Sequence, residues 1–382
     1  MVQYFRTNRQ MNHDLKKYFI IAGEPSGDLH GSKLIRAIKE INPNASFMGH
    51  GGNKMEEEGL KLIEHIDRLS IMGFIEVLKH LPRFNKILKQ TIDLIKKSKP
   101  NRIILIDYPG FNLRLAKKIK NLGIPITYFI LPQVWAWKEK RVEDIKNLID
   151  QPISIFPFEE KWFKSKSLDV FYLGHPFMDL EQINESTKSF YSRHSLNVNE
   201  PILTLLPGSR QQEIDKHWPI FLKTVTMIKK KVENLQVIIG KSSNITIPNC
   251  PKDFRIEKNA RKAIMAGTAA LASSGTTNLE CVIENTPLVV CYKLNLSSWF
   301  IAKLFVKVKY SSIVNIMLDK KVVAEFLQNE MKPNLLSEEI IDLLNTESKG
   351  RQKMLNEFNN IKRMLGDSGV FLRIANLILK ET

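Results

Sequence analysis

Short apolar runs alternate with longer segments of helical periodicity along most of this chain. In the first half the apolar runs lie at residues 18–22, 45–49, 102–106, 125–130, 153–156 and 170–173, and in the second half at 202–206, 235–240, 269–272 and 288–291. Each run has the length of a buried strand, and most of the intervening segments have the length of a helix. Strands separated by helices predict an α/β protein whose parallel sheets are covered on both faces.

A polar stretch divides this pattern into two halves. Gly174-His175-Pro176 ends the first series of strands, and residues 181–200 precede the second series. We therefore predict a tail at 1–17, an N-terminal domain at 18–176, a second domain at 200–355, and C-terminal helices at 356–382 that pack back on the first domain. Two doubly wound domains in tandem would place a ligand in the cleft between the carboxyl ends of both sheets.

Composition narrows the class of protein. The chain has 382 residues and 43% hydrophobic content, which suffices for two domains with proper cores. Residues 1–17 are polar and basic, and no apolar run reaches about 18 residues, so neither a signal peptide nor a spanning helix is expected. Cys250, Cys281 and Cys291 form no Cys-x-x-Cys pair, which fits a reducing cytoplasm and disfavours a zinc knuckle. The net charge of +17 fits nucleic acid, an anionic membrane surface, phosphorylated substrates or simply the host's composition.

The segment that follows the apolar run at 269–272 has the pattern of an anion site. A turn of small residues, with Ser274 and Gly275 at its centre, precedes a predicted helix. If Thr276 or Thr277 caps that helix, its free N–H groups and its dipole favour an anion at the turn. Glu280 lies one turn later, where its carboxylate would accept hydrogen bonds from a sugar diol. The alternative is an ordinary capped helix with an acidic first turn.

A second candidate for phosphate binding follows the run at 202–206. Gly208 frees the backbone of this turn, Ser209 can donate a hydrogen bond, and Arg210 offers a planar fork suited to phosphate oxygens. The alternative is a common Pro-Gly turn beside a solvated arginine. Because both small-residue turns follow strands of the same domain, their combination favours a diphosphate site.

Two carboxylates follow strands of the first half. Asp107 comes directly after the run at 102–106, where it could act as a general base on a substrate hydroxyl, although it could also cap the helix that Pro109 begins. Glu24 occupies the same kind of position after the first strand. Gly23 and Gly27 do not have the dinucleotide spacing, so a Rossmann dehydrogenase is disfavoured. No His-x-x-x-His or Asp-x-Asp pair occurs, so we expect no catalytic metal held in that way.

Two basic segments with apolar positions are candidates for contact with a membrane surface. The segment at 71–99 has apolar residues at helical spacing among lysines and arginines, and the segment at 285–318 contains no acidic residue. The alternative for both is a helix whose apolar residues are core and whose lysines face water. The candidate membrane or acyl-chain contacts are Met72, Phe74, Phe84, Trp299, Phe300 and Phe305.

Seven motifs together resemble lipid-A-disaccharide synthases in order and spacing, from about Tyr18 to the C-terminus. The motifs are Gly-Glu-Pro-Ser-Gly-Asp at 23–28, Leu-Ser-Ile-Met-Gly-Phe-Ile-Glu-Val-Leu at 69–78, Gln-Val-Trp-Ala-Trp at 133–137, Gly-His-Pro at 174–176, Leu-Pro-Gly-Ser-Arg at 206–210, Ser-Gly-Thr-Thr-Asn-Leu-Glu at 274–280 and Val-Ala-Glu-Phe-Leu-Gln at 323–328. Each motif alone is weak, but the set is specific.

The resemblance implies a GT-B glycosyltransferase with two Rossmann-like domains that face a central cleft. Such an enzyme transfers 2,3-diacylglucosamine from UDP-2,3-diacylglucosamine to 2,3-diacylglucosamine 1-phosphate, forming a β-1,6 bond with inversion and releasing UDP. It implies no cofactor, no nucleic acid partner, and a peripheral location on the cytoplasmic face of the inner membrane. A homodimer is left open.

The resemblance also implies roles for individual residues. Asp107 would be the base for the acceptor hydroxyl, and Glu24 a second essential carboxylate on the acceptor side. Arg210 and the turn from Ser274 to Thr276 would stabilise the departing diphosphate, while Glu280 would bind the ribose and Asn315 would belong to the nucleotide site.

Two departures from the family pattern affect these roles. Gly110 replaces a common acidic residue, which leaves Asp107 without an acidic neighbour, and Val314 replaces the proline usual before Asn315. One alternative function is another UDP-sugar enzyme of the same fold, a UDP-N-acetylglucosamine transferase or epimerase, which would turn over a non-acylated donor. Another is a basic surface-binding protein without catalysis.

Overall fold

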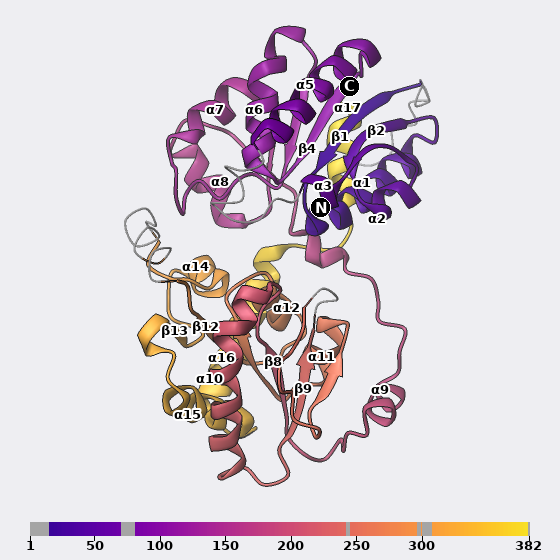
Figure 1. Cartoon of the computed structure of the whole chain (residues 1–382). Helices are drawn as coiled ribbons and strands as arrows, with labels where there is room; N and C mark the ends of the chain where they lie inside the picture. The colour runs from indigo at the N-terminus through magenta and orange to yellow at the C-terminus, as the bar shows by residue number, and fades with distance from the viewer. Residues whose placement is uncertain (1–14, 70–80, 242–244, 296–298, 300–307, 381–382) are drawn as a thin grey trace, which may run out of the picture. The chain divides into compact units, whose positions relative to one another are not determined.

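The computed structural model describes residues 15–69, 81–241, 245–295, 299 and 308–380. The chain divides into two compact units (Figure 1). The first unit comprises residues 1–134, 138–179 and 367–382, and the second comprises residues 135–137 and 180–366. Each unit is built on its own parallel sheet, so the predicted α/β class with two parallel-sheet domains is confirmed.

The first unit contains a seven-stranded parallel sheet with the strand order β3-β2-β1-β4-β5-β6-β7. Its strands are β1 (Lys17–Ala22), β2 (Ser46–Gly51), β3 (Leu60–His65), β4 (Arg102–Ile106), β5 (Ile126–Phe129), β6 (Gln151–Ser154) and β7 (Phe171–Tyr172). Its helices are α1 (Pro25–Ile41), α2 (Asn53–Glu57), α3 (Ile66–Leu69), α5 (Leu81–Ser98), α6 (Pro109–Ile119), α7 (Arg141–Leu148), α8 (Pro157–Lys164) and α17 (Val370–Lys380), with 3₁₀ turns η1 (Lys120–Leu122) and η2 (Pro176–Asp179).

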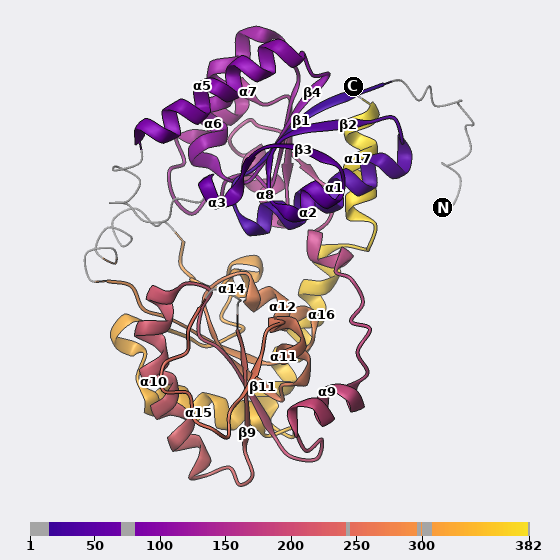
Figure 2. The ribbon, with the colours of Figure 1, turned by 45° about the vertical axis from the view of Figure 1, so that its right-hand side comes forward.

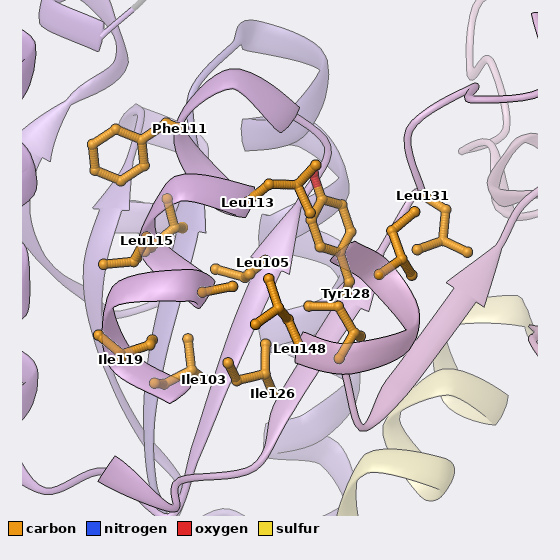
Figure 3. Packing of buried hydrophobic residues seen from close by; sticks show 14 of the residues in the cluster. Ile103, Leu105, Phe111, Leu113, Leu115, Ile119, Ile126, Tyr128, Leu131 and Leu148 are labelled. Atoms are coloured by element: carbon orange, nitrogen blue, oxygen red, sulfur yellow. The ribbon is translucent and has the colours of Figure 1, made fainter. Parts of the chain in front are cut away.

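Helices cover both faces of this sheet because its central strands are apolar on both sides. All five residues of β4 are buried, and alternate residues of β1 and β4 enter different hydrophobic clusters. One cluster packs beneath α5, α6 and α7, and Figure 3 shows part of it. The other packs beneath α1 and α17. Burial on both faces accounts for the continuous apolar runs in the sequence.

The last helix, α17, returns to the first unit, where it packs beside α1 (Figures 1 and 2). The Asp179 carboxylate fixes its start by accepting hydrogen bonds from the N–H groups of Gly369 (2.6 Å) and Phe371 (2.9 Å). The preceding helix, α16 (Lys349–Leu365), belongs to the second unit. Of the C-terminal helices expected to pack on the first domain, α17 alone does so among the described residues.

The second unit contains a six-stranded parallel sheet with the order β10-β9-β8-β11-β12-β13. Its strands are β8 (Ile202–Leu206), β9 (Gln236–Gly240), β10 (Arg255–Glu257), β11 (Ala269–Ser273), β12 (Leu288–Tyr292) and β13 (Glu325–Leu327). Its helices, besides α16, are α9 (Thr187–His194), α10 (Gln211–Lys229), α11 (Ala260–Ala266), α12 (Thr277–Ile283), α14 (Ile313–Leu318) and α15 (Pro333–Leu344), with the 3₁₀ turn η3 (Gln328–Glu330).

A buried carboxylate holds the start of the first unit together. Asp28, in the first turn of α1, is only 4% exposed. Its carboxylate accepts hydrogen bonds from the N–H groups of Gly52 (2.7 Å), Lys54 (3.2 Å) and Met55 (3.0 Å) at the start of α2. Asp28 therefore does not cap its own helix but joins α1 to the segment that follows β2.

We predict that Asp28→Asn lowers the free energy of unfolding by about 2 kcal/mol, because an amide NH₂ would face N–H donors and a charge-assisted hydrogen bond would be lost. Urea unfolding followed by circular dichroism measures this change. Glu40→Gln, at an exposed position of the same helix, is the matched control and should leave the midpoint unchanged. Equal midpoints for the two variants would contradict the structural role of Asp28.

Candidate functional site

Glu24 and Asp107 follow neighbouring strands of the first sheet. Ala22 at the end of β1 is paired in register with Ile106 at the end of β4. Both carboxylates therefore lie at the same edge of the sheet, and the charge of Glu24 acts on Asp107. The sequence predicted that each group follows a strand, and the structure places these two strand ends side by side.

Asp107 is a half-buried carboxyl group on an unusual backbone. Its φ is +45° and that of Tyr108 is +49°, so two consecutive residues other than glycine are left-handed. The pKa of Asp107 is raised from 3.8 to about 6, by burial first and by the Glu24 charge second, against a backbone hydrogen bond from Tyr108 that lowers it. At neutral pH the group is mostly ionised, yet its pKa is near the working pH that suits a general base.

Asp107 does not cap α6, which was the alternative role for this residue. The residue at the N-cap of α6 is Tyr108, and its side chain makes no capping hydrogen bond. Instead the Tyr108 hydroxyl donates to the Leu69 carbonyl (2.7 Å) and its ring stacks on Phe111. A Cβ atom on Gly23 would approach that ring to 2.3 Å, so a glycine is required where the turn after β1 passes Tyr108.

In the second unit, the two turns with phosphate-binding patterns also follow neighbouring strands. Leu206 at the end of β8 pairs with Ala272 near the end of β11. The turn at 207–210 leads into α10 and the turn at 274–276 leads into α12, so both turns lie at one edge of this sheet. The structure therefore brings together the two turns that the sequence singled out.

The first of these turns is held open by Glu213. Gly208 has φ +135°, and a Cβ atom there would come within 2.7 Å of the Glu213 Cβ. The Glu213 carboxylate accepts a hydrogen bond from the Ser209 N–H (3.0 Å) and one from the Tyr292 hydroxyl (3.1 Å). Arg210 lies 3.9 Å from the same carboxylate, and its side chain is 56% exposed. The guanidinium is therefore accessible to an anion.

His217 ties the same turn to the end of β12. Its Nε2 accepts a hydrogen bond from the Lys293 N–H (3.0 Å), so Nδ1 carries the proton that is donated to the Pro207 carbonyl (2.7 Å). Burial lowers the pKa of His217, which keeps the ring neutral in this bridging role. The residue contributes support rather than charge.

The second turn is exposed and has room for a ligand. Gly275 and Thr276 are exposed, and nothing lies within 4 Å of the position a Cβ atom on Gly275 would take. Thr276 occupies the N-cap of α12 as expected, but its side chain makes no capping hydrogen bond. The Ser274 hydroxyl donates to the Ser311 carbonyl (3.1 Å), so it anchors the turn to the segment before α14.

Asn315 is fully buried, and its amide is used within the protein. Its Nδ2 donates to the Val323 carbonyl (2.9 Å) and to Glu325 (2.6 Å), and its Oδ1 accepts from the N–H groups of Val322 and Val323. Glu325 also accepts hydrogen bonds from the Ser311 (2.8 Å) and Ser312 (2.9 Å) N–H groups. Asn315 thus supports the segment that anchors Ser274, and its place in the nucleotide site stays a prediction.

Glu280 lies one turn into α12, as the sequence suggested, and it is half-buried. The pKa of its carboxyl is raised from 4.5 to about 7: burial is the main cause, the nearby Arg261 opposes the rise, and Glu284 adds to it. Arg261 is itself paired with Glu284 (2.5 Å), so its charge is shared. Hydrogen-bond donors such as the hydroxyls of a ribose would stabilise the charged form of this carboxyl group.

The apolar positions expected to form a membrane-contacting stripe on α5 are mostly core. Leu88 and Ile95 are buried, and half-buried Phe84 packs edge-on against Phe111 with the Arg114 guanidinium 5.3 Å from its ring centre. Trp299 is half-buried. Met72, Phe74, Phe300 and Phe305 lie outside the described residues.

Two further observations concern membrane-spanning helices and metal sites. Within the described ranges, no helix is long and apolar enough to cross a membrane. Over the same ranges, no group of three or more His, Cys, Asp or Glu side chains is placed to hold a metal ion.

Several supporting residues were missed because their partners are distant in sequence. Glu213 follows the N-cap Arg210 by three residues, which is the spacing of a capping box and could have identified it. Glu325 stands within one of the family motifs, where an acidic residue in a strand is unusual enough to draw attention. Tyr292 carries no comparable signal, because a tyrosine at the end of a strand is common.

We predict that Glu280→Gln stabilises the protein in a pH-dependent way. Because the folded-state pKa is raised, ionising Glu280 disfavours the folded state; this penalty is absent below about pH 4.5 and complete above about pH 7. The variant should therefore match the parent protein near pH 4.5 and exceed its free energy of unfolding by about 1–3 kcal/mol at pH 8. Urea unfolding at both pH values tests this, with exposed Glu339→Gln as the control; a difference independent of pH would refute the environment assigned to Glu280.

Comparison with solved structures places the fold. A putative UDP-N-acetylglucosamine 2-epimerase from Listeria monocytogenes matches with a TM-score of 0.66 at 12% identity, covering 96% of this chain and 97% of that one. The UDP-GlcNAc 2-epimerase from Neisseria meningitidis, bound to UDP-GlcNAc, matches with a TM-score of 0.65 at 11% identity, covering 95% and 99%. The glycotransferase of kitacinnamycin matches with a TM-score of 0.64 at 12% identity, covering 96% and 98%. These neighbours share the GT-B fold.

Comparison of sequences identifies the family. The lipid-A-disaccharide synthase of Myxococcus xanthus is 33% identical over 372 residues, covering 95% of this chain and 97% of the relative. That of Coxiella burnetii is 30% identical over 368 residues, covering 95% and 98%. The lipid-A-disaccharide synthetase family model matches residues 18–368, which include the second unit, most of the first unit and every residue of the candidate site. The chain therefore belongs to the lipid-A-disaccharide synthase family of glycosyltransferases.

Proposed function

We propose that the protein transfers 2,3-diacylglucosamine from UDP-2,3-diacylglucosamine to 2,3-diacylglucosamine 1-phosphate, forming a β-1,6 bond and releasing UDP. The observation that carries the proposal is the match to the family over residues 18–368, together with a half-buried carboxyl group at the strand edge of the first unit and two phosphate-binding turns at that of the second. The non-acylated alternative, a UDP-N-acetylglucosamine enzyme, rests on fold similarity alone.

In this proposal Asp107 is the base that removes the proton from the acceptor hydroxyl. Its raised pKa supports the role, because a carboxylate with a pKa of about 6 is a better proton acceptor than one at 3.8 and still ionised at pH 7. Glu24 contributes its charge to that pKa and would also be available to an acceptor hydroxyl. Inversion at the anomeric carbon then follows from direct attack of the activated oxygen.

The donor UDP-sugar would bind to the second unit. Arg210 would neutralise the diphosphate with its exposed guanidinium, while the turn from Ser274 to Thr276 would supply the backbone N–H groups of Gly275 and Thr276. The Ser274 N–H is donated to the Cys291 carbonyl (3.1 Å), so Ser274 anchors the turn. Glu280 would accept hydrogen bonds from the ribose. These fixed donors meet the negative charge that develops on the leaving UDP, so the reaction as proposed needs neither a metal nor a cofactor.

We also propose that the protein binds peripherally to the cytoplasmic face of the inner membrane, where its acylated substrates reside. Apart from Asp93, the exposed charged residues of α5, α6 and the segments that follow them are basic, and the two helices lie side by side in Figures 1 and 2. Because the apolar residues of α5 are largely core, charge rather than insertion would provide the attraction on this face. The exposed charges are Arg83, Lys86, Lys89, Asp93, Lys96, Lys97, Lys99, Arg114, Lys117, Lys118 and Lys120.

We predict that Asp107→Asn lowers kcat for UDP release from the acylated pair by roughly 100- to 10,000-fold, because an amide cannot accept the hydroxyl proton. UDP binding, measured by calorimetry, should be unchanged, since Asp107 belongs to the first unit. In the parent protein, kcat/KM should fall as the pH is lowered through about 6.

The control for this experiment is exposed Asp93→Asn, which should have the parent's kcat. Full activity of Asp107→Asn would overturn the assignment of the base. Turnover of plain UDP-N-acetylglucosamine with none of the acylated pair would instead overturn the substrate while leaving the fold and the family intact.

We predict that reversing two charges on α5, in the double variant Lys86→Glu/Lys89→Glu, weakens binding to phosphatidylglycerol vesicles at least several-fold at low salt. Cosedimentation measures the bound fraction. The matched control is Lys223→Glu/Lys230→Glu, at exposed positions in α10 and at its C-cap, which changes the net charge equally. An equal loss of binding in both double variants would show that net charge, and not the α5 and α6 face, is responsible.

A further inference from the structure

The backbone at Asp107 requires support that the residue does not provide for itself. Left-handed φ values of +45° and +49° at Asp107 and Tyr108 are unfavourable for residues with a Cβ atom, above all for an aromatic one. Aspartate tolerates this conformation better than tyrosine does. Two such residues in succession persist only when the surroundings over-determine them.

Two buried side chains converge on the Asp107 carbonyl oxygen. The Asn112 Nδ2 donates to it at 2.7 Å, and the Tyr128 hydroxyl donates to it at 2.6 Å. The Asn112 amide also donates to the Ile106 carbonyl at 3.3 Å, and the Asp107 N–H donates to the Phe129 carbonyl at 3.0 Å. The peptide groups on both sides of Asp107 are thus held from α6 and from β5.

Neither donor is accessible for any other task. Asn112 and Tyr128 are both 0% exposed, and Tyr128 is part of the apolar cluster of Figure 3. Burial raises the pKa of the Tyr128 hydroxyl, with the Asp107 charge acting in the same direction, so this group keeps its proton and remains a donor. The Asn112 Oδ1 has no hydrogen-bond partner among the described residues, so the amide's contribution here is donation from its NH₂ group.

We propose that Asn112 and Tyr128 are positioning residues that clamp the Asp107 carbonyl and thereby hold the Asp107 carboxylate in its half-buried place beside Glu24. If the clamp is lost, the backbone can relax towards the conformations that L-residues prefer, and the carboxylate then moves away from its buried place towards solvent. The inference rests on the proposed role of Asp107 as the base. It adds to that role the two groups that fix the direction of the base.

A clamp that positions the carboxylate predicts that loss of either donor changes the pH dependence of the reaction. Donors that merely satisfied buried polar groups would not predict this change. The pKa of Asp107 is about 6 because of burial first and of the Glu24 charge second. The other ionisable groups around it are the hydroxyls of Tyr108 and Tyr128, with Arg141 acting on Tyr128. A carboxylate that moves towards solvent loses its burial, so its pKa falls towards the ordinary value.

We predict that Tyr128→Phe and Asn112→Ala each lower kcat for UDP release by about 10- to 100-fold, with KM values for both substrates within about twofold of the parent's. The acid limb of the kcat/KM profile should also move below its position in the parent protein. Steady-state kinetics from pH 4.5 to 8 measure both changes. The matched control is Tyr191→Phe in the second unit, which likewise removes a hydroxyl that donates to a backbone carbonyl, that of Ala266.

The outcomes separate this inference from the one it rests on. Asp107→Asn inactive, with Tyr128→Phe unchanged in both kcat and acid limb, overturns the clamp and leaves the base in place. Asp107→Asn active overturns the base and the clamp together. If Asn112→Ala does not fold, Tyr128→Phe decides the question, because it removes a single oxygen atom and keeps the ring in its apolar cluster.

Discussion

Hydrogen bonds from backbone N–H groups to carboxylates hold the segments that surround both candidate sites. Asp28 fixes the start of α2, Asp179 fixes the start of α17, and Glu159 accepts the N–H groups of Ile155 and Phe156 after β6. Glu213 and Glu325 do the same for the two parts of the second unit that carry the candidate phosphate-binding turns. In a parallel sheet the carboxyl ends of all strands lie on the same side. The segments that follow these ends contain many N–H groups without a strand partner. Charge-assisted hydrogen bonds are strong enough to fix them.

The carboxylates that support the backbone are a different set from the two carboxyl groups with proposed roles in the reaction. Carboxylates that accept backbone N–H groups have their charge stabilised by the fold itself. Asp107 and Glu280 instead have raised pKa values, to about 6 and about 7, because burial removes solvent without equal compensation. A group in that state gains from a ligand that donates hydrogen bonds or a proton. The two raised pKa values therefore belong to residues that the sequence pattern also singles out, Asp107 at a strand end and Glu280 one turn into α12.

The central strands could be predicted from the sequence because burial on both faces leaves a continuous apolar run. The predicted strands at 102–106 and 202–206 coincide with β4 and β8. The strands β3, β10 and β13 were missed because each lies at an edge of its sheet and carries polar residues, such as Lys61 and Glu64 in β3. A strand that is buried on both faces is visible in the apolar pattern, whereas these three edge strands are not.

The positions of the candidate site residues were predictable, but their environments were not. Asp107 could be located because it directly follows an apolar run, and Arg210 because it ends the short turn that follows another. The left-handed backbone at Asp107 could not, since neither it nor Tyr108 is a glycine, and the strain is offset by partners on β5 and α6. In the same way, Asn315 was expected near the nucleotide, but its side chain is engaged by a segment seven to ten residues away in sequence.

The two units thus hold the carboxyl ends of their strands, where the candidate site residues lie, in different ways. The first keeps its carboxyl group on a strained backbone with buried donors beneath it, which favours a single direction for a base. The second keeps an exposed arginine and an open glycine turn above a network of carboxylates, which leaves room for a large anionic ligand. A base must be aimed within a narrow angle, whereas charge neutralisation by a guanidinium tolerates movement. The rigid support in the first unit therefore suits proton transfer, and the open support in the second unit suits the departure of a diphosphate.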